Sequence, residues 1–390
     1  MSALRLIRPL GRSLRCQPSE QLLGRNVNVS RVLCAFITSK ANMGAYQRPA
    51  PFPYKEKKYN YWHQYFDRTV DRFDENTKVL VVDGPIGAGK TTFAKQLAAD
   101  LDMLYVPEAD FDMFYLNAYG ADLRSLNSKL SPNAQFVDVK EFYRNPKHVN
   151  SGVMQVQMQE IRFDQYIDAL AHLLNTGQGV VLDRSIYSDF VFMEAMYESG
   201  YMTKQIKAYY EEQYKSMKIM LKQPHLVIYL DVPVSIVQKR IKERNRDWEV
   251  NSSVLTEKYL GAIDRVYKEK FLKEMSLKSE VLVYDWSNFG DVEVVVEDIE
   301  RLDMSESPYE KRFEDWKVQK DREFAYMRWE YTNNKEALKD QAEPGYLFPE
   351  MMFTSDEASQ VLALMKGLPG GKYTEGYDPR AGDSVLFKLK

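Results

Sequence analysis

Eight consecutive residues, Gly84 to Thr91, have the types and the spacing of a phosphate-binding loop. Their sequence, GPIGAGKT, matches the pattern G-x-x-x-x-G-K-(S/T) between an apolar, β-branched run and a helical pattern. Glycines in such a loop let backbone amides point at phosphate oxygens, while the lysine contacts the β- and γ-phosphates and the threonine hydroxyl binds Mg²⁺. We therefore predict a nucleotide-binding site made of Gly84, Gly87, Gly89, Lys90, Thr91 and Thr92.

Phosphoryl transfer also needs a base for the acceptor and a carboxylate near the metal, and the sequence offers candidates for both. Glu108 follows a second short apolar run, and Asp183 and Arg184 follow a third. Because the carboxyl ends of parallel strands form the ligand-binding edge of an open α/β sheet, these residues are expected to lie together. Taken alone, Glu108 is also consistent with a helix-capping acid. The candidate catalytic residues are Glu108, Asp183 and Arg184, with Thr91 and Asp183 as the Mg²⁺ ligands.

Several cations occur close together between Lys239 and Arg246, on a predicted helix end and loop. Alone, such a run is typical of a solvated face. Beside a phosphate-binding loop it instead indicates a lid that closes over phosphates. We assign this role to Arg240, Arg244 and Arg246.

The elements that must position these residues alternate between strand and helix. Apolar runs at 78–83, 104–107, 179–183, 225–232 and 280–286 predict strands, and helical patterns cover 154–174, 187–221, 254–275 and 292–302. This alternation predicts an α/β fold with a parallel sheet and helices on both faces, over residues 78–302. Residues 110–150 read as a long irregular segment. Residues 309–339 read as one charged, aromatic helix within a C-terminal extension, 303–390.

The first 45 residues differ from the rest in charge. They carry seven basic residues and one acid, whereas the whole chain has 53 Lys and Arg, 56 Asp and Glu and a net charge of −3. Residues 46–390 therefore have 46 basic and 55 acidic residues, a net of −9, which argues against a nucleic-acid partner. Residues 1–45 resemble a mitochondrial presequence, with a cut predicted within 31–45; an ordinary basic tail is the alternative. The cut would remove Cys16 and Cys34, the only cysteines, which excludes a cysteine-ligated iron–sulfur cluster.

Four segments, GPIGAGKTTF, VPE, DRSIYSD and RIKERNRDWE, together resemble the deoxynucleoside kinase family over residues 78–302. The resemblance implies a P-loop kinase fold in which Glu108 is the base for the sugar 5′-hydroxyl, although Ala109 replaces the usual proline. It also implies that Asp183-Arg184-Ser185 replaces the family's Glu-Arg-Ser with a shorter carboxylate. The implied nucleoside-binding residues are Gln155, Arg162 and Asp189 for the base and Glu249 for the 3′-hydroxyl, with Arg240, Arg244 and Arg246 as lid arginines.

A second resemblance covers residues 51–390. The segments PFPYKEKKYNYWHQYFDRT, GQGVVLDRSIYSDFVFMEAMY and LPGGKYTEGYDPRAGD are similar to a family of accessory subunits of mitochondrial respiratory complex I. This implies a non-catalytic subunit in the mitochondrial matrix, peripheral to the inner membrane, that contacts other complex I subunits on the matrix side of the membrane arm. The family has been described as binding FAD, but this sequence has no G-x-G-x-x-G fingerprint to support it. No apolar run is long enough to span a bilayer.

Two interpretations follow, and a third, a small-molecule oxidoreductase, is set aside because the sequence has no redox motif. The preferred one is an accessory subunit that retains a pocket for ATP, ADP or a deoxynucleotide with Mg²⁺. The alternative is an active mitochondrial deoxynucleoside kinase that phosphorylates the 5′-hydroxyl with ATP. Under the first interpretation, residues 46–77 and 303–390 are docking extensions. Their interface-type residues either contact partners or pack onto the chain's own domain, and the sequence leaves this open for Tyr326, Arg328, Trp329, Tyr331, Phe348 and Phe353.

Overall fold

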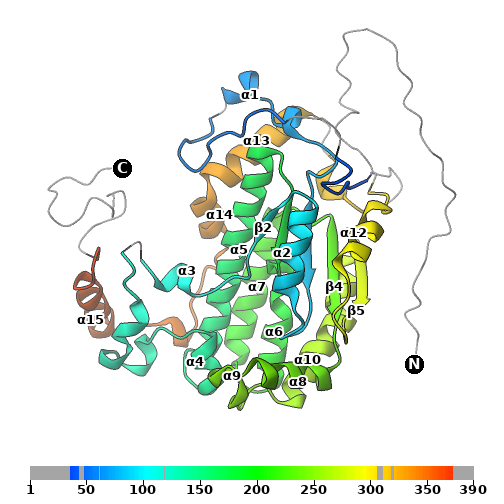
Figure 1. The fold of residues 1–390 in the computed structure, drawn as a ribbon. Coiled ribbons are helices and arrows are strands. Elements are labelled where there is room, and N and C mark those ends of the chain that lie inside the picture. The colour runs from blue at the N-terminus through cyan, green and yellow to red at the C-terminus, as the bar shows by residue number, and fades with distance from the viewer. Residues whose placement is uncertain are drawn as a thin grey trace, which may run out of the picture. The chain divides into compact units, whose positions relative to one another are not determined.

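A parallel sheet forms the centre of the computed structural model, which describes residues 36–43, 48–60, 62–117, 119–304, 311–317 and 320–371. Its five strands run in the order β2-β3-β1-β4-β5 (Figure 1). Strands β1, β3 and β4 are almost completely buried, as expected for apolar strands covered on both faces. The strands are β1 (Val79–Asp83), β2 (Leu104–Val106), β3 (Val180–Asp183), β4 (Leu226–Asp231) and β5 (Glu280–Asp285).

The direction of the crossovers places the helices in two layers. The chain moves one way along the sheet from β1 to β2, and the other way in each later crossover. Right-handed crossovers therefore put α2 (Lys90–Asp100) on one face and the later helices on the opposite face. Contacts agree, because α12 (Val292–Glu300) packs on α2, whereas α6 (Ile186–Glu198) packs on α5 (Ser151–Thr176) and α10 (Glu257–Val266). The expected α/β fold class is confirmed.

The segment after β2, predicted to be irregular, consists of short helical turns. They are α3 (Asp112–Tyr115), η3 (Leu123–Lys129), η4 (Pro132–Ala134) and α4 (Val139–Arg144). Arg124 holds them together, since its guanidinium pairs with Asp112, Asp122 and Asp138 at 2.5, 2.9 and 2.8 Å. Helix α15 (Ser355–Lys366) covers this segment and forms a second small apolar cluster with Leu126, Leu130 and Ala134.

The single helix predicted over 309–339 is wrong. The structure instead has η6 (Glu314–Trp316), α13 (Asp321–Asn333), α14 (Lys335–Ala342) and η7 (Pro349–Met351). The break between α13 and α14 falls at Asn334, and the side chain of Asn333 bonds to the backbone of Tyr59, a competition with helix that asparagine often makes. Helices α13 and α14 pack on α5 and on α7 (Lys204–Met220), so this part of the extension is integral to the fold.

A fully buried arginine joins three distant parts of the chain. Arg328 on α13 pairs with Asp67 at 2.8 Å, donates to the Asn175 side chain at 2.7 Å and lies 4.0 Å above the ring of Tyr59. Asp67 and Tyr59 belong to the segment 46–77, which contains α1 (His63–Phe66) and η2 (Thr69–Arg72). Of the interface-type residues left open above, Arg328, Tyr331 and Phe348 are buried in the chain's own domain, whereas Tyr326 and Phe353 are exposed.

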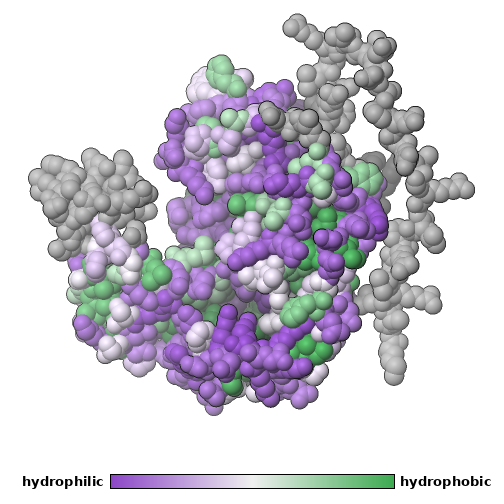
Figure 2. All heavy atoms as spheres, viewed as in Figure 1, coloured by the Kyte–Doolittle hydropathy of each residue, from purple (hydrophilic) through white to green (hydrophobic). Residues whose placement is uncertain are grey.

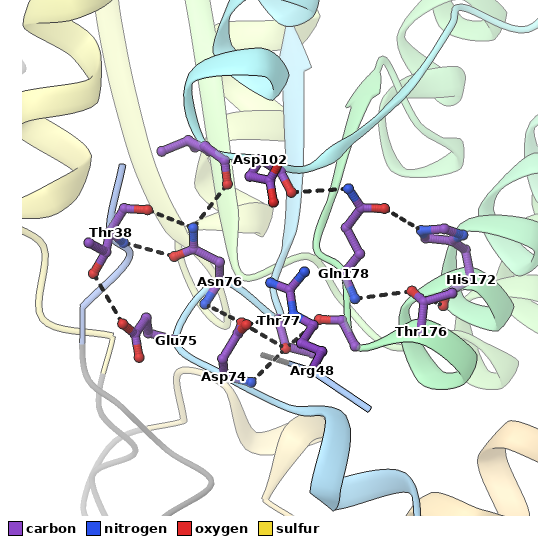
Figure 3. Close-up of polar contacts among 12 residues, drawn as sticks. Thr38, Arg48, Asp74, Glu75, Asn76, Thr77, Asp102, His172, Thr176 and Gln178 are labelled. Carbon is purple, nitrogen blue, oxygen red and sulfur yellow. Dashed lines mark hydrogen bonds and ion pairs between the residues drawn. The ribbon is translucent and has the colours of Figure 1, made fainter. Parts of the chain in front are cut away.

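Polar side chains close the amino edge of the sheet, opposite the phosphate-binding loop (Figure 3). Asn76, just before β1, accepts from the Thr38 amide at 2.8 Å and donates to the carbonyls of Thr38 and Leu101 at 2.6 and 2.9 Å. Gln178, just before β3, donates to the Asp102 carbonyl at 3.1 Å and contacts the His172 ring at 3.1 Å. The turns that precede two central strands are thereby fixed to one another.

The N-terminal residues 36–43 belong to this network. Ile37 is 1% exposed and lies in the main core, the Ser39 amide donates to Glu300 at 2.7 Å, and the Lys40 amide donates to the Asp100 carbonyl at 2.8 Å. These residues fall inside the window predicted for presequence cleavage, while the predicted presequence residues 1–35 lie outside the described residues, as do 44–47, 305–310 and 372–390. None of the described helices is both long and apolar enough to cross a membrane.

We expect a chain that begins at Gly44 to be less stable than one that begins at Phe36. The shorter chain loses the buried Ile37 side chain and leaves the Asn76 amide without two partners, a loss of about 3 kcal/mol. Thermal unfolding of the two chains by circular dichroism measures the difference, with the full-length chain as the reference. Equal midpoints for the two truncated chains would contradict the packing of residues 36–43.

Candidate functional site

The phosphate-binding loop lies between β1 and α2, with its glycines in conformations that other residues avoid. Gly87 and Gly89 have φ of +73° and +90°, and Gly89 is the N-cap of α2. Lys90 begins the helix, is buried, and turns its ammonium back into the loop to donate to the Pro85 carbonyl at 3.1 Å. Burial, together with the nearby Arg184, lowers the pKa of Lys90 to about 8 despite three carboxylates that raise it. The loop therefore holds a confined cation beside its glycine-rich backbone.

A metal-type pair of side chains lies beside the loop. The Thr91 hydroxyl donates to Asp183 Oδ2 at 2.5 Å, while Asp183 Oδ1 is buried and has no hydrogen-bond partner. Burial raises the pKa of Asp183, opposed chiefly by Lys90. An unpartnered carboxylate oxygen next to a threonine hydroxyl and a phosphate loop fits the oxygen ligands that Mg²⁺ prefers. Thr92, the residue that follows Thr91 in α2, is exposed.

Arg184 is the centre of the site. Its backbone has φ +66°, unusual for a residue other than glycine. Its guanidinium forms an ion pair with Glu108 at 2.8 Å and donates to the Tyr267 hydroxyl at 2.5 Å. The Tyr267 hydroxyl in turn donates to Asp83 at 2.7 Å, and the guanidinium lies 4.7 Å from the ring centre of Phe192. Tyr267 comes from η5 (Tyr267–Phe271), one π-helical turn between α10 and α11 (Leu272–Met275).

Glu108 lies where the sequence places it, at the carboxyl end of β2. Its side chain is 41% exposed, 2.8 Å from Arg184 and 3.7 Å from Arg162. Burial would raise the pKa of Glu108, but Arg184, Lys90 and Arg162 outweigh it and lower the pKa. Glu108 is thus an ionised carboxylate at the mouth of the site, able to accept a hydrogen bond or a proton.

The three residues expected to bind a base meet at one carboxylate. Asp189, fully buried on α6, accepts from Arg162 at 2.5 Å and from Gln155 at 2.8 Å, both on α5. Tyr210 on α7, which the sequence reasoning missed, donates to the same carboxylate at 2.5 Å. The Asp189 carboxylate therefore accepts hydrogen bonds from three side chains of the protein itself, while Arg162 Nε is left without a hydrogen-bond partner among the described residues.

The lid arginines contact the protein itself. Arg244, at the end of α8 (Val234–Arg244), pairs with the buried Glu249 of α9 (Asp247–Val250) at 2.5 Å, and Arg246 lies 3.5 Å from the same carboxylate. Arg240 donates to the carbonyls of Ala88, Trp286 and Ser287 at 3.3, 2.8 and 3.0 Å. The cations expected over the phosphates are thus engaged in this structure by a carboxylate or by backbone oxygens.

The residues that sequence reasoning missed are mostly tyrosines. Tyr267 and Tyr210 reach the site from distant helices, and Tyr143 on α4 is close enough to Glu249 and Glu108 that both raise its pKa further, after burial. Asp83 had a usable signal, because an acid at the end of an apolar strand and next to the glycine loop is unusual. The tyrosines had none, since nothing local distinguishes them among the 26 tyrosines of the chain.

Comparison with known proteins gives two related results. The family model described as deoxynucleoside kinase matches residues 80–318. The mitochondrial protein NADH dehydrogenase (ubiquinone) 1 alpha subcomplex subunit 10 of Mus musculus is 40% identical over 323 residues, 82% of this chain and 86% of that protein. Its Bos taurus counterpart is 38% identical over 82% of this chain and 90% of its own length.

Kinases match a smaller part of the chain. Deoxyguanosine kinase of Dictyostelium discoideum is 30% identical over 232 residues, 59% of this chain and 72% of that enzyme. Among solved structures, deoxyadenosine kinase from M. mycoides with bound dATP is 22% identical with a TM-score of 0.42, over 57% of this chain and 96% of that chain.

Replacing Lys90 by alanine is expected to weaken nucleotide binding about a hundredfold, because it removes the buried cation of the loop. Calorimetric titration with ATP, ADP and dATP in the presence of Mg²⁺ measures the affinity. The matched control is Lys95→Ala, which removes an exposed lysine from the same helix. Undiminished binding by the Lys90 variant would contradict the assignment of the loop.

Nucleotide affinity should also decrease as the pH rises above about 8. Below about pH 8 Lys90 is already protonated in the free protein, so the affinity is flat in this range. Above that pH the phosphate must recruit a proton to Lys90, and the dissociation constant rises by at most about tenfold per pH unit. The same titrations between pH 6.5 and 9.5 test this, and a rise that persists in Lys90→Ala would assign the effect to another group.

Proposed function

The chain belongs to the deoxynucleoside kinase family and to the family of complex I subunits named NADH dehydrogenase (ubiquinone) 1 alpha subcomplex subunit 10, and on this basis we propose that it is an accessory subunit of mitochondrial respiratory complex I. The observation that carries the proposal is the extent of similarity. The mouse subunit aligns with 82% of the chain, whereas the slime-mould kinase aligns with 59% at lower identity. In this role the protein supports the assembly or stability of the complex and carries no electrons itself.

The folded extensions support this role. Helices α13 and α14 follow the part of the chain that the kinase family model covers, and they bury Phe324, Met327 and Leu338. Their outer surface exposes Tyr326, and the segment before α15 exposes Met352 and Phe353. Aromatic residues and methionine are enriched at protein interfaces, so these surfaces are suited to neighbouring subunits.

We further propose a nucleoside phosphate with Mg²⁺ as the ligand of the retained pocket. The loop amides and Lys90 would hold the phosphates, while Thr91 and the unpartnered Asp183 oxygen would hold the metal. The metal would neutralise phosphate charge when bound. This local positive site suits a body that is otherwise acidic.

Kinase activity is the second candidate, favoured by Glu108 at the mouth of the site beside Arg184. In that reaction Glu108 would accept the proton of a sugar 5′-hydroxyl as its oxygen attacks the terminal phosphorus, and Arg184 would stabilise the charge on the transferring group. The lowered pKa of Glu108 makes it a weak base, and Arg244 and Arg246 would have to leave Glu249 to reach the phosphates. We therefore rank turnover below nucleotide retention.

For location, we propose the matrix side of the inner mitochondrial membrane, with residues at the start of the chain acting as a transit peptide. The names of the relatives include mitochondrial, and the basic, acid-poor composition of residues 1–45 agrees. A peripheral association is consistent with the mostly hydrophilic surface on the face drawn in Figure 2.

Rescue in cells that lack the protein separates the two candidates. We expect the wild-type chain to co-migrate with complex I on a native gel, and the double variant Glu108→Gln with Asp183→Asn to restore the complex to the same level. Both changes keep side-chain size, and the unfolding midpoint of each purified variant controls for stability. Failure of the wild-type chain to co-migrate contradicts the subunit role. Failure of both the folded double variant and the single variant Glu108→Gln indicates that turnover matters, whereas failure of the double variant only indicates a need for the proposed metal ligand Asp183.

A further inference from the structure

Helix α1 and the residue before it expose three large aromatic side chains within five residues. Trp62, Tyr65 and Phe66 are 72%, 64% and 91% exposed. Figure 2 shows a small hydrophobic group projecting among more polar residues at the end of the molecule where Figure 1 places α1. Isolated exposed apolar residues are ordinary, but a cluster of this size usually marks a surface that something covers.

The residues beneath this helix fix its orientation. The rings of Tyr59 and His63 stack with centres 5.5 Å apart, and Phe52 contacts both edge-on at 5.7 and 5.1 Å. Arg328 lies on the Tyr59 ring, and the Asn60 amide donates to His63 at 3.0 Å. Because these contacts hold one side of α1 against the domain, the side chains of Trp62, Tyr65 and Phe66 stay in solvent.

The turn that precedes Tyr59 is basic. Lys55, Lys57 and Lys58 are exposed together with one acid, Glu56, and the amides of Glu56 and Lys57 both donate to the Pro53 carbonyl. Lys58 is four residues from Trp62, so at most about 14 Å of chain separates them.

The acids next to α1 are already neutralised. Asp67 pairs with Arg72 and Arg328, while Asp71 and the α13 residue Asp321 share Arg68. These three acids face three arginines, so the three lysines against Glu56 give this surface a positive surplus, in contrast to the net −9 of residues 46–390.

We propose that this aromatic-basic patch (Lys55, Lys57, Lys58, Trp62, Tyr65 and Phe66) docks on the surface of an anionic lipid bilayer. Tryptophan and tyrosine prefer the headgroup region, and lysines near the surface are attracted to anionic lipids. A protein partner fits less well, because lysine is depleted from protein interfaces. The choice of a membrane rests on the proposed location at the inner mitochondrial membrane, and the contact is interfacial, with the aromatic rings at headgroup depth.

Co-sedimentation with vesicles tests the patch. The chain beginning at Phe36 keeps every described contact and omits the basic first 35 residues, which would bind anionic lipid by themselves. Vesicles of phosphatidylcholine mixed with cardiolipin serve as the probe, and pure phosphatidylcholine vesicles as the reference. We expect binding to the mixed vesicles that decreases with salt, and a loss of about tenfold or more in Trp62→Ser with Phe66→Ser.

Matched variants identify the source of the binding. Lys57→Glu with Lys58→Glu should weaken binding to the mixed vesicles at least about tenfold. Ile219→Ser with Leu277→Ser, which removes two exposed apolar side chains elsewhere, should leave it unchanged. Unfolding midpoints confirm that each variant is folded.

Two outcomes overturn the proposal. One is no binding of the folded wild-type chain to the cardiolipin vesicles, or binding that the Trp62 and Phe66 changes do not affect. The other is loss of complex I co-migration in the Trp62 and Phe66 variant without any vesicle binding by the wild-type chain, which would assign the patch to a protein partner. Vesicle binding is measured on the purified chain, so it is independent of whether the chain enters complex I.

Discussion

The carboxyl edge of the sheet depends on keeping two buried charges, Asp83 and Arg184, compensated. Both side chains are almost completely inaccessible to solvent, and an unpaired charge in such a place costs several kcal/mol. Arg184 satisfies this constraint by its ion pair with Glu108 and its hydrogen bond to Tyr267, and Tyr267 in turn donates to Asp83. The positive φ of Arg184 and the π-helical turn that carries Tyr267 are local irregularities that these long-range bonds offset. These ion pairs and hydrogen bonds thus connect the ends of β1 and β3 with η5 and with Glu108.

The two ends of the candidate site differ in how fully their charged side chains are already paired. At the phosphate end, the Lys90 ammonium, which donates to the Pro85 carbonyl, and one oxygen of Asp183 have capacity for further ligands. At the nucleoside end, Asp189 already accepts three hydrogen bonds, and Glu249 holds two lid arginines. A ligand can therefore contact Lys90 and Asp183 without the loss of an existing ion pair, whereas contacts from the lid arginines or from the Asp189 cluster require internal bonds to be exchanged.

Local sequence patterns predicted the parts of the molecule that local physics determines. The five buried strands and the glycine loop follow from short apolar runs and one motif, and they place Lys90, Thr91, Glu108, Asp183 and Arg184 on one edge. The roles of Tyr267, Tyr210 and Arg328 depend on partners more than 20 residues away, which no local pattern encodes. The break at Asn334 likewise follows from a contact with Tyr59, 274 residues from Asn333. The folding of residues 36–43 onto the body was hidden by a composition typical of a targeting segment.

Helices α1 and α13 of the two extensions lie at one end of the sheet and the predicted lid helices α8 and α9 at the other (Figure 1), whereas α15 packs on the segment after β2. Helix α5 connects the two ends, since its 26 residues extend about 39 Å. It carries Gln155 and Arg162 beside Asp189, and near its C-terminus Asn175 bonds both Arg328 and Thr332 of α13. A shift of α13 would have to move Asn175 or break its bonds. Because the same continuous helix carries Gln155 and Arg162, the C-terminal extension and the Asp189 cluster are attached to one element of the fold.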